Sequence, residues 1–85
     1  MSYVKHFLSD ISYNKYVKNK LADRLSELLD ENKISKRKLA NEIGVSASSI
    51  SDWSTGKIQP TAENIYLLSD YFKISSDYLL GLTDI

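Results

Sequence analysis

The chain has 85 residues, of which 42% are hydrophobic and 26% are charged, and its basic and acidic side chains balance to a formal net charge of zero. This length predicts one small domain with a single core, and the absence of cysteine excludes disulfide bonds and thiolate-ligated metals. Because His6 is the only histidine and the three glycines are scattered, we expect no enzyme activity, no metal site and no cofactor.

The charge is unevenly distributed along the chain. Residues 33–57 carry five basic residues against two acidic ones, whereas residues 21–32 carry one basic residue against four acidic ones. A local basic block of this kind is typical of nucleic-acid binding, even where the total charge is zero.

The N-terminal segment, residues 1–17, is predicted to be a helical extension of the domain. It lacks the apolar block of a signal peptide, and no stretch of the chain is long enough to cross a bilayer, so we expect a cytoplasmic protein without membrane contact. We expect the extension to pack on its own domain or, alternatively, to form a dimer contact or a swapped arm. Its apolar residues share one helical face: Tyr3, Val4, Phe7, Leu8 and Ile11.

Residues 18–85 are predicted to form an all-α domain of five helices, because no segment alternates polar and apolar residues as a strand requires. In the first helix four leucines recur at the spacing of one helical face: Leu21, Leu25, Leu28 and Leu29. Ser35 can cap the start of the second helix. Gly44 lies at its end, where a helix commonly stops at a residue in the left-handed backbone conformation. The buried stripe of this second helix is Leu39, Ala40 and Ile43.

The third helix, residues 46–55, is predicted to begin with Ser46 as its cap and to point Ile50 into the core. Ala47 and Trp53 flank Ile50 at three residues to either side, and we expect Trp53 to be a packing residue. Gly56 closes the helix.

Two more helices follow the "KIQP" loop. Thr61 can cap the fourth, whose buried face is Ile65, Leu68 and Phe72. Ser75 or Ser76 can cap a short fifth helix that holds Leu79 and Leu80 and ends at Gly81. The remaining aromatic residues are expected at the rims of helix contacts rather than in a stacking platform for RNA: Tyr66, Tyr71 and Tyr78.

The two short helices around Gly44 match the helix-turn-helix arrangement, in which the second helix enters the DNA major groove. Ala40 lets the helices approach closely, and Gly44 permits the positive φ of the turn. An ordinary helical hairpin in a bundle has the same spacing.

The stretch "SKRKLANEIGVSASSISDWSTGKIQPTAENIYLLSDYFKISSDYLLG", residues 35–81, resembles the lambda-repressor-like (Cro-type, XRE-like) helix-turn-helix family. With the first helix the resemblance covers roughly residues 20–82 and includes "GVS" at 44–46 and "ISSDYLLG" at 74–81. It implies a five-helix domain that binds operator DNA as a dimer and represses, or occasionally activates, transcription.

The sequence departs from the usual pattern of that family at three positions. Members commonly carry Gln in place of Lys36. Many also carry an Arg and a Glu, paired beneath the recognition helix, where this chain has Leu29 and Ser54. The joint loss is physically coherent, because loss of one partner alone would leave a charge unpaired in a semi-buried site.

Basic and hydroxyl side chains gather at the ends of these two helices. Lys36, Arg37 and Lys38 occupy the first turn of the second helix, where the macrodipole disfavours cations by roughly 0.3–1 kcal/mol each. A DNA phosphate at this N-terminus would reverse the sign, and Asp30 and Glu31 are the alternative, intramolecular counter-charges. The expected phosphate contacts are Ser35, Lys36, Arg37, Ser46, Thr55 and Lys57.

The face of the third helix opposite Ile50 carries short polar side chains. At about 100° per residue, Ser48, Asp52 and Thr55 point most directly outward, Ser49 lies on the flank and Ala47 lies nearer the core. Short side chains suit a helix pressed into a groove about 12 Å wide, and the Asp52 carboxylate can accept a hydrogen bond from cytosine N4. A solvated polar face is the alternative explanation. The expected base contacts are Ala47, Ser48, Ser49 and Asp52.

The sequence therefore predicts a sequence-specific regulator of transcription, most simply a repressor. It would bind double-stranded operator DNA as a homodimer and read the major groove with the helix at residues 46–55. No small-molecule substrate is indicated. The alternative is a protein-interaction module of the same fold, similar to an antitoxin or an antirepressor, without base readout.

Overall fold

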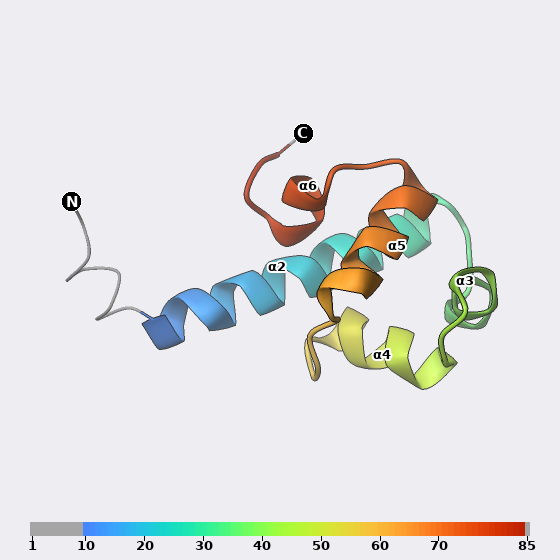
Figure 1. The fold of residues 1–85 in the computed structure, drawn as a ribbon, viewed down its shortest axis with the longest axis horizontal. Helices are drawn as coiled ribbons and strands as arrows, with labels where there is room; N and C mark the ends of the chain where they lie inside the picture. The colour runs from blue at the N-terminus through green and yellow to red at the C-terminus, as the bar shows by residue number, and fades with distance from the viewer. Residues whose placement is uncertain (1–9, 85) are drawn as a thin grey trace.

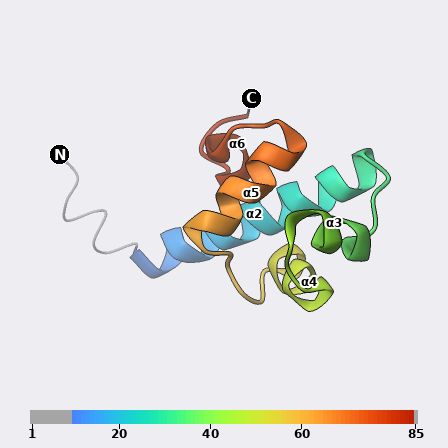
Figure 2. The same ribbon diagram turned by 45° about the vertical axis from the view of Figure 1, so that its right-hand side comes forward.

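The structure, a computed structural model, describes residues 10–84, with side chains described from Lys20 onward. Within this range it consists of five helices and no strand: α2 (Asp10–Glu31), α3 (Lys36–Ile43), α4 (Ala47–Thr55), α5 (Ala62–Phe72) and α6 (Ser76–Leu80). In Figures 1 and 2, α4 lies along one side of α2 and α6 along the other, while α5 crosses it. The predicted all-α class is confirmed.

The long helix α2 runs without a break through the boundary predicted between residues 17 and 18. Its sequence, DISYNKYVKNKLADRLSELLDE, contains neither glycine nor proline, so nothing local ends the helix there. The first turns of α2 project beyond the other helices in both views (Figures 1 and 2). The predicted apolar stripe from Tyr3 to Ile11 lies outside the residues whose side chains are described.

One hydrophobic core joins all five helices. Ile50 is fully buried, and Trp53 packs in the core as the sequence predicts. Burial of a leucine or isoleucine side chain is worth roughly 1.5–3 kcal/mol, and short isolated helices are marginal in water. The shared core therefore holds α3 and α4 in place. Its buried members are Leu21, Leu25, Leu28, Leu29, Leu39, Ala40, Ile50, Trp53, Leu68 and Leu79.

Side-chain caps begin each helix after α2. Each cap oxygen accepts a hydrogen bond from the backbone N–H three residues later, and the caps are Ser35, Ser46, Thr61 and Ser75. These are the predicted residues, and Ser75 rather than Ser76 caps α6. The ends of α3, α4 and α6 are glycines with positive φ, as predicted, whereas α5 ends at Lys73, which adopts a φ of 58°.

Two side chains lie in environments that the sequence does not predict. Ala47, the first residue of α4, is exposed, although the helical angle places it nearer the core. Tyr66 is 65% exposed rather than packed at a rim. It lies two residues before Leu68, so its side chain projects on the face of α5 opposite to that fully buried leucine.

Candidate nucleic-acid interface

The α3–α4 unit has the geometry of a helix-turn-helix. After α3, the N–H groups of Gly44 and Val45 both donate to the Ala40 carbonyl, at 2.9 and 3.0 Å. A Cβ at Gly44 would meet no atom within 4 Å, so the turn requires glycine for its φ of 79° and not for space. Ala40 is 2% exposed, and its small side chain permits α3 and α4 to pack closely.

The face of α4 turned away from the core carries small polar side chains. Ala47 and Ser48 are exposed, and Asp52 is half-buried with no ion pair or hydrogen bond from its carboxylate within the described residues. Ser49 is more constrained: its N–H donates to the Ser46 hydroxyl oxygen at 3.1 Å, and the two hydroxyls lie 3.0 Å apart. Of the four candidate base contacts, three are therefore free and Ser49 is tied to the helix cap.

The N-terminus of α3 presents several donors together. The Ser35 hydroxyl accepts from the Lys38 N–H at 3.0 Å, which leaves its own hydrogen available. The N–H groups of Lys36 and Arg37 have no acceptor within the helix, because they belong to its first turn. Their exposed side chains form no ion pair within residues 20–84, so the alternative counter-charges, Asp30 and Glu31, do not neutralise them.

The C-terminal end of α4 contributes one more free cation. Lys57 is exposed, and its side chain forms no ion pair with the described residues. The Thr55 hydroxyl does not serve as the predicted phosphate donor, because it already donates to the Ser51 carbonyl at 2.9 Å. A hydroxyl has one hydrogen, so in this conformation Thr55 has none to offer a phosphate.

Negative charge is concentrated on the exposed face of α2. Four carboxylates share the exposed face of α2 and form no ion pair within the described residues: Asp23, Glu27, Asp30 and Glu31. The buried leucines of α2 face the core, so this acidic face of α2 points away from the core. A polyanion would therefore be attracted to the α3–α4 side and repelled from the α2 side.

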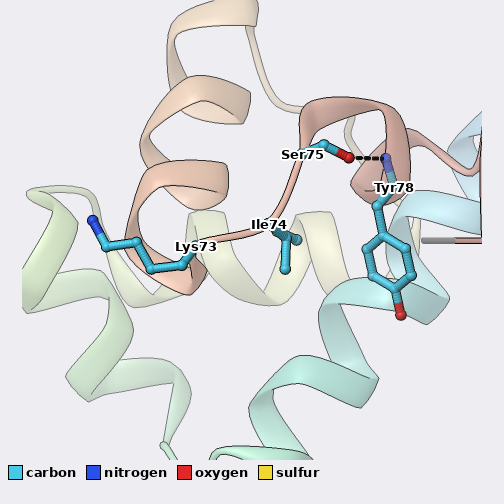
Figure 3. Close-up of a pocket in the computed structure, with 4 residues that line it drawn as sticks. All are labelled: Lys73, Ile74, Ser75 and Tyr78. Atoms are coloured by element: carbon cyan, nitrogen blue, oxygen red, sulfur yellow. Dashed lines mark hydrogen bonds between the residues drawn. The ribbon is translucent and has the colours of Figure 1, made fainter.

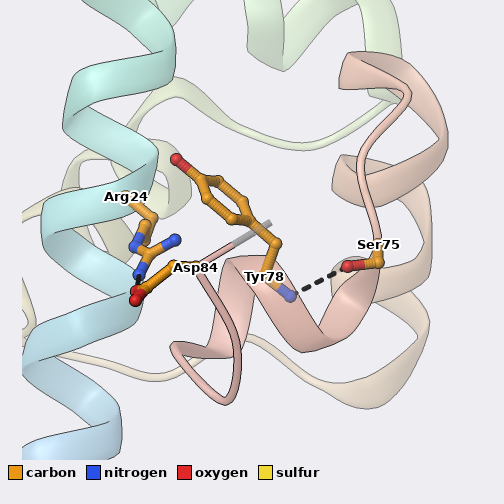
Figure 4. Close-up of polar contacts among 4 residues, drawn as sticks. All are labelled: Arg24, Ser75, Tyr78 and Asp84. Atoms are coloured by element: carbon orange, nitrogen blue, oxygen red, sulfur yellow. Dashed lines mark hydrogen bonds and ion pairs between the residues drawn. The ribbon is translucent and has the colours of Figure 1, made fainter.

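Two polar residues of α2 that the sequence did not single out make long-range contacts. Arg24 is 8% exposed, lies with its guanidinium carbon 4.0 Å from the centre of the Tyr78 ring and pairs with Asp84 at 3.2 Å (Figure 4). Ser26 donates to the Ser54 carbonyl at 3.1 Å. Both partners are distant in sequence, so no local pattern could have indicated them.

Arg24 holds the C-terminal segment on the α6 side of the molecule, away from α4. An open hollow beside α6 is lined by Lys73, Ile74, Ser75 and Tyr78, and the Lys73 side chain points away from Ile74 and Tyr78 (Figure 3).

Within the described residues, no helix combines the length and apolar character that a membrane span requires, and no three metal-ligating side chains come together.

Comparison with known proteins agrees with this geometry. The helix-turn-helix family model matches residues 25–79, which include α3, α4 and α5. The chain belongs to the XRE-like helix-turn-helix family. The resemblance predicted from the sequence is thereby confirmed.

One relative in this family is the uncharacterized HTH-type transcriptional regulator YobD of Bacillus subtilis (strain 168). It is 33% identical over 61 residues, which make up 72% of this chain and 54% of YobD, so the chain spans about half the length of this relative. No solved structure matches the chain significantly. The family and the relative support a DNA-binding regulator.

Proposed function

We propose that this protein is a sequence-specific regulator of transcription that binds double-stranded operator DNA through α3 and α4. The observation that carries the proposal is the exposed face of α4 with its small side chains, together with the unpaired cations at the start of α3, Lys36 and Arg37, and just after α4, Lys57. Short side chains allow a helix to enter the major groove, and flanking cations suit the phosphates on either side.

In this proposal the N-terminus of α3 binds a backbone phosphate. One anion could be bound by several groups at this end of α3: the free N–H groups of Lys36 and Arg37, their two basic side chains and the Ser35 hydroxyl. Without an anion, cations in a first helical turn are disfavoured by roughly 0.3–1 kcal/mol each. A phosphate therefore reverses an unfavourable interaction, which gives α3 a reason to carry this basic turn.

Base discrimination falls to the outward residues of α4. The unpartnered Asp52 carboxylate can only accept hydrogen bonds, and cytosine N4 offers a donor in the major groove. Ser48 can donate or accept, so it contributes contact with weaker discrimination. The Ala47 methyl group is suited to an apolar contact with a thymine methyl.

Repression by a homodimer is the form of regulation that we propose. Among the described residues each copy offers few unpaired cations at the α3–α4 surface, so counterion release there supports only weak binding by one copy. Two copies on half-sites about one helical turn apart, roughly 34 Å, would combine their affinities. A protein seated in the major groove of an operator blocks access of other proteins to the same DNA.

The test is a titration of the protein against a pool of random duplexes, with single-stranded DNA of equal length as control, followed by selection and sequencing. We expect duplex affinity to fall with rising salt and one sequence to be enriched. If no duplex is bound at moderate salt and no sequence is enriched, a protein-interaction module of the same fold becomes the better explanation of the exposed face of α4.

A further inference from the structure

The C-terminal end of α4 is joined to α2 by a hydrogen bond between distant residues. The Ser26 hydroxyl donates to the Ser54 carbonyl at 3.1 Å, across 28 residues of sequence. Ser54 is 8% exposed, so its carbonyl lies where water has little access. The last four carbonyls of a helix have no partner within the helix, and each needs one elsewhere.

The neighbouring carbonyls find their partners within the chain that follows α4. The Asp52 carbonyl accepts from the N–H groups of Lys57 and Ile58, and the Trp53 carbonyl accepts from Gly56. The Ser54 hydroxyl does not reach α2, because it donates back to the Ser51 carbonyl at 3.2 Å. The Ser54 carbonyl thus receives its hydrogen bond from another helix.

The hydroxyl of Ser26 is used in an unusual way for a serine inside a helix. Such serines commonly donate to the carbonyl four residues earlier in their own helix. Ser26 instead directs its single hydrogen across the α2–α4 interface. Around it the contact is apolar, formed by leucines of α2 with Ile50 and Trp53.

We propose that Ser26 is a positioning residue for base recognition, a role that rests on the proposed DNA-binding function. Apolar packing is non-directional and permits small rotations and shifts of a helix, whereas a hydrogen bond fixes distance and direction. By capping α4 from α2, Ser26 sets the orientation of the whole helix, including Ser48 and Asp52 on its far side. Ser26 itself touches no DNA.

Loss of the Ser26 hydroxyl should affect specific and non-specific DNA binding differently. Base contacts depend on placement to a fraction of an ångström, whereas interactions between cations and phosphates are long-ranged and tolerant. Removal of the Ser26 hydroxyl should therefore lower affinity for the preferred site and leave affinity for random duplexes, with its salt dependence, unchanged. A merely structural role would not separate these quantities.

The experiment compares Ser26→Ala and Ser26→Thr with the control Ser69→Ala. Ser69 is 7% exposed, and its hydroxyl lies 3.2 Å from that of Ser76 between α5 and α6, so the control removes an interhelical bond away from α4. The readouts are the affinity for the selected site relative to random duplexes and the salt slope. Amide exchange of Thr55 to Lys57 is measured in the DNA-free protein.

We expect Ser26→Ala to lower the affinity ratio about tenfold, the factor equivalent to one net hydrogen bond, and to speed amide exchange at the end of α4. Ser26→Thr, which retains a hydroxyl, should keep the ratio within a factor of about two to three. Ser69→Ala should leave the ratio unchanged, although it lowers the melting temperature.

An unchanged ratio in Ser26→Ala, or an equal drop in Ser69→Ala, would overturn the positioning role while the DNA-binding function stands. If the wild-type protein itself prefers no sequence, the DNA-binding function fails instead. The exchange measurement then decides the cap alone: faster exchange in Ser26→Ala supports it, and unchanged exchange overturns it.

Discussion

At the scale of single residues, Lys36, Arg37 and Lys57 form no ion pair within the described residues, whereas two other exposed lysines do. Lys38 pairs with Glu42 at 3.9 Å and Lys73 with Asp70 at 3.4 Å, whereas Lys36 has no carboxylate partner within the described residues. A lysine without a carboxylate partner can neutralise a DNA phosphate and thereby release a counterion that was condensed on the DNA.

We therefore predict that Lys36→Ala weakens binding by a similar factor on every duplex. The plot of log affinity against log salt has a negative slope, and its magnitude should decrease by about 0.9, the value expected when the protein neutralises one phosphate fewer. Lys73→Ala is the matched control, because it removes an exposed lysine at the end of α5, outside the proposed interface. Affinity measured at four salt concentrations checks this, and equal effects of the two variants would contradict it.

Arg24 illustrates a buried charge whose stabilising contact is a ring and not an acid. Its side chain is 9% exposed against the Tyr78 ring, while that of its partner Asp84 is 97% exposed, so solvent screens the ion pair. Arg24→Ala should lower the free energy of unfolding by about 2 kcal/mol through loss of the stacking and of packed side-chain atoms. Asp84→Ala should cost little.

Chemical denaturation of both variants in low and high salt provides the measurement. The Arg24 effect should persist in high salt, because stacking on a ring in a buried site is screened weakly. An equal loss from Asp84→Ala would instead assign the contribution to the ion pair.

At the scale of elements, the helix ends are set by local chemistry that is legible in the sequence. The serine and threonine caps and the three glycines lie where short-range rules place them, because a cap contacts an N–H only three residues away. Lys73 at the end of α5 is an exception, because the following chain must reach α6 and a non-glycine residue adopts the positive φ.

Long-range contacts are the part that local rules could not supply. Arg24 lies beside the leucine stripe as an apparent surface residue, and its burial depends on Tyr78 and Asp84. Ser26 likewise acquires its role only when α4 is placed against α2. For the candidate site, the outward face of α4 followed from helical periodicity, whereas the use of the Thr55 hydroxyl within its own helix did not.

The two glycines Gly44 and Gly81 allow a prediction about how closely helices approach. Both have a φ near 80°, but a Cβ at Gly44 would meet no atom within 4 Å, whereas one at Gly81 would lie 2.6 Å from the Lys20 Cβ. Gly44→Ala should cost about 1–2 kcal/mol of unfolding free energy from backbone strain alone. Gly81→Ala should cost roughly 1–3 kcal/mol more, because α6 must shift away from α2.

Thermal unfolding of the two alanine variants is the check. Equal losses of stability would show that α6 and α2 adjust without strain and that the close approach at Gly81 does not contribute.

At the scale of the whole molecule, charge is divided between two sides. The acidic face of α2 and the basic ends of α3 and α4 point in different directions, so a net charge of zero conceals a domain with a preferred side for a polyanion. Because each copy has few unpaired cations between Lys20 and Asp84, the remaining affinity in this proposal comes from the dimer.

We compare two duplexes whose selected half-sites have centres about 10 and about 15 base pairs apart. The shorter spacing places both half-sites on one face of the DNA, so we expect that duplex to bind the protein more tightly. Gel-shift titration with sedimentation of the complexes checks both affinity and stoichiometry. Equal affinity for the two spacings would indicate that the copies bind independently.

We propose that the exposed face of α4 discriminates between base pairs. It is tested by the affinity of Asp52→Ala for the selected site and for every single-base variant of it, with Asp23→Ala, which removes an exposed acid of α2 outside the proposed interface, as control. We expect Asp52→Ala to lose about 1–3 kcal/mol of preference at one base pair and Asp23→Ala to lose none. Uniformly tighter binding of Asp52→Ala to all of these duplexes, with every preference unchanged, would contradict it.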